Sequence, residues 1–191
     1  MNRRQAIGRI VLAGLGSALA IGGYEWYERN RTPDLSFLDK SHALVAALAD
    51  TIIPPTAAPG AVAAGVPDCL VRLLRDCADR HTQNNFIDGL RSIDAHCQSA
   101  YGHGFADCAA PDRVAALTRS ERKDRPLTGI WGKAENRFLG KPFFTTLKEY
   151  TVIAYCTSEQ GATHGLAYVG IPVHYQGCLP WQPGQPAWAT K

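Results

Sequence analysis

Apolar side chains recur at the spacing of an α-helix along most of this chain, and this period limits the folds that it can adopt. The first such segment is expected to begin with Asp39 as its N-cap and to end near Ile52. Its apolar face carries Leu44, Val45, Leu48 and Ile52. The same period returns in three further segments, at 67–79, 83–101 and 141–156. Because no alternating series is long enough for a sheet, the sequence predicts a mainly α domain of about four main helices.

Proline and glycine interrupt these helices and are frequent in the last part of the chain. Pro54-Pro55 is expected to stop the first helix. Between the third and fourth helices we expect a short helical turn at 111–117 and then a charged, exposed loop at 118–125. From Gly161 onward the helical period is weak, so an extended course is expected. The predicted organisation is a signal segment at 1–29, a helical domain at 30–160 and an extended C-terminal arm at 161–191.

The N-terminus has the layout of an export signal. Arg3 and Arg4 precede an uncharged, moderately hydrophobic run, and a small-residue cleavage site ends at Ala20. The paired arginines indicate the twin-arginine type, which the export machinery would recognise. An uncleaved anchor is the alternative, because Trp26 follows the run and could lie at a membrane interface. Since this route exports folded proteins, the mature domain should hold a cofactor or travel with a partner that does.

The charge distribution argues against a nucleic-acid partner. The chain of 191 residues has a net charge of +3, and the three arginines in the first 20 residues account for all of it. The remainder is neutral, so it lacks the basic surplus with which proteins neutralise phosphates. A neutral surface also favours association with other proteins.

Six cysteines are present, but their spacing matches no common cofactor site. They are Cys69, Cys77, Cys97, Cys108, Cys156 and Cys178. No C-x-x-C, haem-attachment, iron–sulfur, dinucleotide-binding or hydrolase motif occurs, and a zinc site around Cys97 and Cys108 has no matching pattern. In an oxidising compartment an even count favours disulfides, with connectivity open, while buried thiols are the alternative. We therefore expect no catalytic, cofactor-binding or metal-binding residue in this chain.

Several stretches together resemble one protein family. They are Leu48–Thr56, Pro59-Gly60-Ala61, Gly65–Asp68, Phe143–Leu147, Tyr155–Gly161 and Tyr175–Trp181. These stretches resemble the gluconate 2-dehydrogenase subunit 3 family, the small subunit of membrane-bound flavin-dependent sugar and sugar-acid dehydrogenases. The resemblance covers most of residues 38–181.

This resemblance implies a non-catalytic small (gamma) subunit of a periplasmic complex at the inner membrane. The expected partners are a large dehydrogenase subunit that binds FAD and a membrane-bound subunit that carries haem c. The small subunit would escort the large one through twin-arginine export and stabilise it. The alternatives are the small subunit of a fructose, sorbitol or other sugar or alcohol dehydrogenase, or a free-standing periplasmic redox or binding protein.

The arm is the candidate contact with the large subunit. Its aromatic and cysteine side chains are the predicted interface residues: Tyr168, Tyr175, Cys178, Trp181 and Trp188. Exposed Trp and Tyr are favoured anchors at protein interfaces. Cys178 is a candidate for a disulfide to the partner, while an internal bond to Cys156 is the competing possibility.

Overall fold

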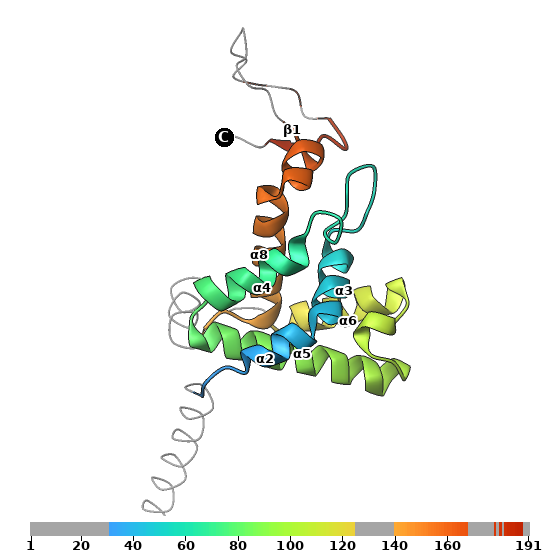
Figure 1. Cartoon of the computed structure of the whole chain (residues 1–191). Helices are drawn as coiled ribbons and strands as arrows, with labels where there is room; N and C mark the ends of the chain where they lie inside the picture. Colours follow the sequence, from blue (N-terminus) through green and yellow to red (C-terminus); the bar gives the residue numbers. More distant parts are fainter. Residues whose placement is uncertain (1–30, 125–139, 168–177, 179, 181, 189–191) are drawn as a thin grey trace, which may run out of the picture.

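The computed structural model describes residues 31–124, 140–167, 178, 180 and 182–188 (Figure 1). The predicted signal, including Arg3, Arg4 and Ala20, lies outside these residues, so export stays a prediction. Within them, no helix has both the length and the apolar character needed to cross a bilayer.

The described chain is mainly helical, which confirms the mainly α prediction. In chain order the elements are α2 (Leu35–Lys40), α3 (His42–Ile52), α4 (Val66–Cys77), α5 (Arg80–Tyr101), the 3-10 turn η1 (Phe105–Asp107), α6 (Ala110–Lys123), α8 (Phe143–Thr157), the π-helical turn η2 (Gly161–Gly165), β1 (Leu166–Ala167) and β2 (Ala187–Trp188). The four main helices of the sequence prediction are α3, α4, α5 and α8.

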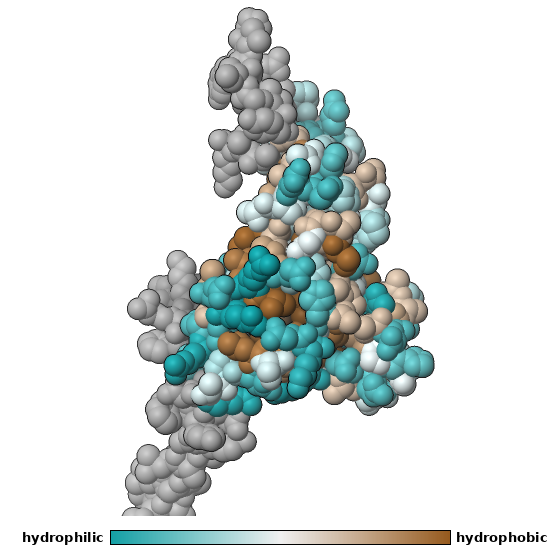
Figure 2. All heavy atoms as spheres, viewed as in Figure 1, coloured by the Kyte–Doolittle hydropathy of each residue, from teal (hydrophilic) through white to brown (hydrophobic). Residues whose placement is uncertain are grey.

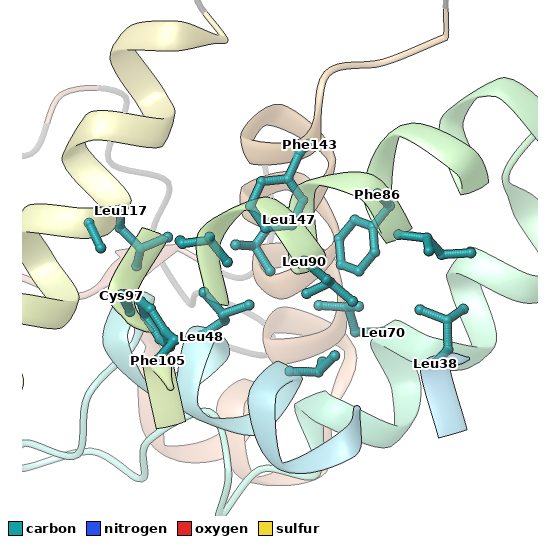
Figure 3. Packing of buried hydrophobic residues seen from close by; sticks show 14 of the residues in the cluster. Leu38, Leu48, Leu70, Phe86, Leu90, Cys97, Phe105, Leu117, Phe143 and Leu147 are labelled. Atoms are coloured by element: carbon teal, nitrogen blue, oxygen red, sulfur yellow. The ribbon is translucent and has the colours of Figure 1, made fainter. Parts of the chain in front are cut away.

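The core lies between α3, α4, α5 and α8, and α8 packs against each of the other three helices (Figure 3). The fully buried side chains include Leu48, Leu70, Phe86, Leu90 and Leu147. Phe86 on α5 and Phe143 on α8 stack with their ring centroids 5.3 Å apart. The apolar period predicted for α5 is confirmed, because Phe86, Leu90, Ile93 and Cys97 are all buried.

The start of the domain differs from the prediction. Asp39 is not an N-cap but an exposed residue inside α2, where it accepts a hydrogen bond of 2.7 Å from Arg75. The cap is Asp34, whose carboxylate accepts from the backbone N–H of Phe37. Because Asp34 supplies a cap one turn earlier and Leu38 is buried, the helical region begins before Asp39 and then breaks at Ser41.

The region after α5 is more helical than predicted. The expected short turn at 111–117 and exposed loop at 118–125 are wrong, since α6 runs unbroken to Lys123. Ala116 and Leu117 are buried on its inner face. The long charged side chains that follow are good helix formers, and no glycine or proline interrupts them before Pro126. A polar surface sequence was thus mistaken for a loop.

Candidate partner-binding surface

The end of α8 meets the proline- and glycine-rich loop that joins α3 to α4. Tyr155 on α8 is buried, and its hydroxyl donates a 2.8 Å hydrogen bond to the backbone carbonyl of Pro59. The loop is closed at its base by the N–H of Ala61, which donates to the carbonyl of Ile53 at 2.9 Å. Figure 1 shows this loop and the end of α8 at the same end of the molecule.

A second, smaller core holds this junction together. Its buried members are Ala49, Ala61, Ala64, Val66, Ala154 and Tyr155. They come from α3, the loop, α4 and α8. The stretches 48–56, 59–61 and 65–68, which lie far from 155–161 in sequence, therefore pack against it in the fold. Their common role here is structural, because small side chains allow close contact around one buried tyrosine.

The chain beyond α8 wraps around Tyr155 before it becomes extended. The prediction of an extended course from Gly161 is wrong for its first residues, which form the π-helical turn η2. A Cβ on Gly161 would lie 2.0 Å from the carbonyl oxygen of Tyr155, and one on Gly165 would lie 2.7 Å from the Tyr155 ring. Only glycine fits these two positions. Ser158 supports the turn by accepting a 3.0 Å hydrogen bond from the N–H of Gly161.

The C-terminal arm returns to its own start. Leu166 and Ala167 of β1 pair in parallel with Ala187 and Trp188 of β2. Between the strands, the described arm residues 178, 180 and 182–186 are all exposed. Cys178 is therefore an exposed thiol, and Trp188 is 45% exposed although it lies in a strand. The other predicted interface residues, Tyr168, Tyr175 and Trp181, lie outside the described residues.

Exposed apolar side chains gather on the segments that build this end of the molecule. Val62 lies on the loop, Val152 and Ile153 lie on the second half of α8, and Trp188 lies on the arm. Figure 2 shows brown hydrophobic residues interrupting the hydrophilic surface. Val152 and Ile153 are not among the predicted interface residues. Their exposure can be inferred from the sequence, because both apolar residues fall outside the buried stripe of Phe143, Leu147 and Ala154 on the same helix.

A groove between α6 and α8 extends this apolar surface. Its volume is about 540 Å³, and Phe144, Val152 and Ile153 form its apolar wall. Charged side chains surround them: Glu121, Asp124, Lys148 and Glu149. Asp124 joins the two helices by accepting a 2.9 Å hydrogen bond from the N–H of Phe144. An apolar strip with a charged rim is the usual anatomy of a protein interface.

The six cysteines do not share one environment. Cys97 and Cys108 are buried, Cys69 and Cys156 are half-buried, and Cys77 and Cys178 are exposed, all as free thiols. The helical period of 67–79 predicts that Cys77 faces inward with Leu70 and Leu74, but this is wrong, because Cys77 is exposed. Cys77 is the last residue of α4, and the chain becomes extended at Ala78, which turns it away from the core. Among the described residues, no three His, Cys, Asp or Glu side chains come together as a metal site.

Comparison with known families identifies one match. The model of the family described as gluconate 2-dehydrogenase subunit 3 matches residues 39–173, which is more than two thirds of the chain. The matched region runs from α2 through α8 and into the arm. Comparisons with curated proteins and with solved structures found no match.

Proposed function

Because the chain belongs to the gluconate 2-dehydrogenase subunit 3 family, we propose that it is the non-catalytic small subunit of a periplasmic, membrane-associated dehydrogenase complex. Its direct partner would be a large subunit that binds FAD and oxidises a sugar or sugar acid. A second partner carrying haem c would pass the electrons to the membrane. Family membership over residues 39–173 is the observation that carries this proposal.

The sequence supports an accessory role. It contains no dinucleotide-binding, haem-attachment or iron–sulfur motif, so the redox groups of the complex would belong to the other subunits. Substrate choice would then lie in the large subunit. The remaining contribution of this chain is to bind the folded partner and raise its stability by mass action.

The surface at the end of α8 supports a docking role. Val152 and Ile153 are 43% and 41% exposed, and they share one wall of the α6–α8 groove. Covering the exposed two-fifths of each side chain against a partner would stabilise a complex by roughly 1 kcal/mol for each one. The arm begins directly beyond this helix, so both could contact one partner at once. Groove and arm would then form a continuous interface with the large subunit.

Coexpression with the large flavin subunit tests the proposal. The large subunit should be recovered in higher yield, and should unfold at a higher temperature, when this chain is present. Val152→Glu with Ile153→Glu should remove both effects, because it places two charges in the apolar wall. Val114→Glu is the matched control, since Val114 is 53% exposed on α6 but does not line the groove.

The outcomes separate clearly. Equal yield and equal thermal stability of the large subunit with and without this chain would refute the accessory role. A loss of binding in both the α8 double variant and the Val114 variant would refute the assignment of the groove. A flavin or haem spectrum from the purified chain alone would instead favour a free-standing redox protein.

A further inference from the structure

We propose that Cys97 and Cys108 form an intrachain disulfide once this protein is in the periplasm. The location rests on the proposed export, whereas the pairing itself rests on the geometry of the core. The bond would join the last turns of α5 to the end of η1 and close a short surface loop. It is a covalent modification of the helical domain, separate from any bond that Cys178 makes.

The two thiols are neighbours inside the core. Cys97 is 0% exposed and Cys108 is 5% exposed, and both belong to the main apolar cluster, in which Figure 3 labels Cys97. The turn η1, which leads directly into Cys108, packs against α5, and the Cys108 thiol is close enough to Cys97 to raise the pKa of that thiol. Cys108 in turn donates its S–H to the carbonyl of Gly104 at 3.3 Å. The other four cysteines are all half-buried or exposed, so this pair alone is enclosed in the core.

Interactions other than the thiols hold the intervening loop in place. Gly102 ends α5 in the left-handed conformation, with a φ of 80°, which turns the chain back on itself. Phe105 is fully buried, and its N–H donates a 2.9 Å hydrogen bond to the carboxylate of Asp94 on α5. These contacts hold the loop between the two cysteines, together with η1, against α5.

The environment of Cys97 decides when the bond can form. Burial, together with the neighbouring Cys108 thiol, raises the pKa of the Cys97 thiol to about 12 and so favours its neutral form. Thiol–disulfide exchange requires a thiolate, so the closed loop resists oxidation. Opening of the exposed surface segment around Gly102 and His103 would hydrate Cys108 first and Cys97 second.

The chemistry balances with a disulfide oxidant. The Cys108 thiolate attacks the oxidant's disulfide and forms a mixed disulfide, which releases one thiol of the oxidant. The Cys97 thiolate then attacks the Cys108 sulfur and displaces the second. The two cysteines lose two protons and two electrons, and the oxidant gains both. In the periplasm, thiol-oxidising proteins supply this acceptor, whereas the cytoplasm keeps thiols reduced.

Mass spectrometry provides a direct test. Trypsin cleaves after Arg91 and Arg113, so one peptide, 92–113, contains both cysteines and no other. The full chain is purified reduced, incubated with glutathione disulfide, then unfolded and alkylated. We expect peptide 92–113 to take no alkyl group and to be about 2 Da lighter than its reduced form. After reduction the same peptide should take two alkyl groups. This control shows that the alkylating reagent reaches both sulfurs.

Thermal unfolding gives an independent readout. Reductant should lower the midpoint of the oxidised chain by about 5–10 °C. Reductant should not change the unfolding midpoint of the Cys97→Ala, Cys108→Ala double variant. If peptide 92–113 takes two alkyl groups or a glutathione adduct after oxidation, or if reductant leaves both midpoints unchanged, the bond does not exist. Cell fractionation distinguishes the absence of this disulfide from a failure of the proposed function. A chain that stays in the cytoplasm contradicts the proposed export, but it does not contradict the pairing of Cys97 with Cys108.

Discussion

At the scale of single residues, the closest contact between α5 and α8 depends on the absence of a side chain. Gly89 lies on α5 directly under Phe143, and a Cβ there would be 2.1 Å from Cγ of that ring. Phe143 is 5% exposed and stacks on Phe86, so it cannot move away without disturbing the core. A glycine inside a helix is normally unfavourable, and here close packing explains it.

Gly89→Ala should therefore destabilise the chain, although alanine is the better helix former by about 1 kcal/mol. Overpacking of this kind lowers the free energy of unfolding by about 1–3 kcal/mol. Urea denaturation measures the change. Ser99→Ala, at an exposed position of the same helix, is the control and should leave stability unchanged or slightly raised. An alanine at position 89 that stabilises the protein would contradict the packing described here.

Tyr155 tests the junction between α8 and the loop at 54–65. Tyr155→Phe keeps the buried ring but removes the donor to the Pro59 carbonyl. We expect a loss of about 1–2 kcal/mol in the free energy of unfolding, because that carbonyl loses its partner. Amide hydrogen exchange should quicken at Ala61 and Val66, whose N–H groups close the loop. Unchanged exchange at both amides would show that the hydroxyl does not hold the loop.

At the scale of elements, the arm is where local pattern and tertiary contact disagree. Its composition predicts an extended segment, yet the first turn after α8 is helical and β1 pairs with β2. The exposed stretch between them has no buried side chain among its described residues. These described residues are open to a partner, because none of them is buried in the core of this chain.

Removing the residues after Gly177 should weaken binding to the large subunit while the helical domain remains folded. The truncation takes away Cys178, Trp181 and Trp188, and with them β2. Affinity measured by titration of the purified subunits gives the result, and circular dichroism of the truncated chain confirms that its helices remain. Undiminished affinity would show that the arm is not an anchor.

The exposed thiol of Cys178 allows a covalent link across the same interface. Electrophoresis of the assembled complex without reductant should show a band at the combined mass of the two subunits. Cys178→Ser should abolish that band, and Cys77→Ser, which changes the other exposed cysteine, should not. Complete separation of the wild-type subunits without reductant would exclude the link.

At the scale of the whole molecule, export and assembly are coupled in the proposed function. Replacing Arg3 and Arg4 with lysine should remove most dehydrogenase activity from the periplasm, because the large subunit would depend on this signal. Arg9→Lys is the control, since it lies outside the arginine pair. Activity assays on fractionated cells measure the effect. Normal periplasmic activity in the double variant would mean that the partner travels by another route.

The sequence by itself determined the fold class and the four main helices. Apolar residues at helical spacing specify a buried face whatever that face packs against, so the period alone predicts α3, α4, α5 and α8. Proline and glycine likewise mark the loop at 54–65, because the fixed φ of proline and the conformational freedom of glycine act on the local backbone. The family was also readable in the sequence, since its stretches are local.

Only the tertiary structure decided which of these parts meet. The turn at Gly161 depends on the space around Tyr155, which no local pattern reveals. The contacts between Tyr155 and Pro59, and between Cys97 and Cys108, depend on how the helices cross. Periodicity reports that a side chain is buried but carries no information about its partner, because many packings satisfy the same pattern.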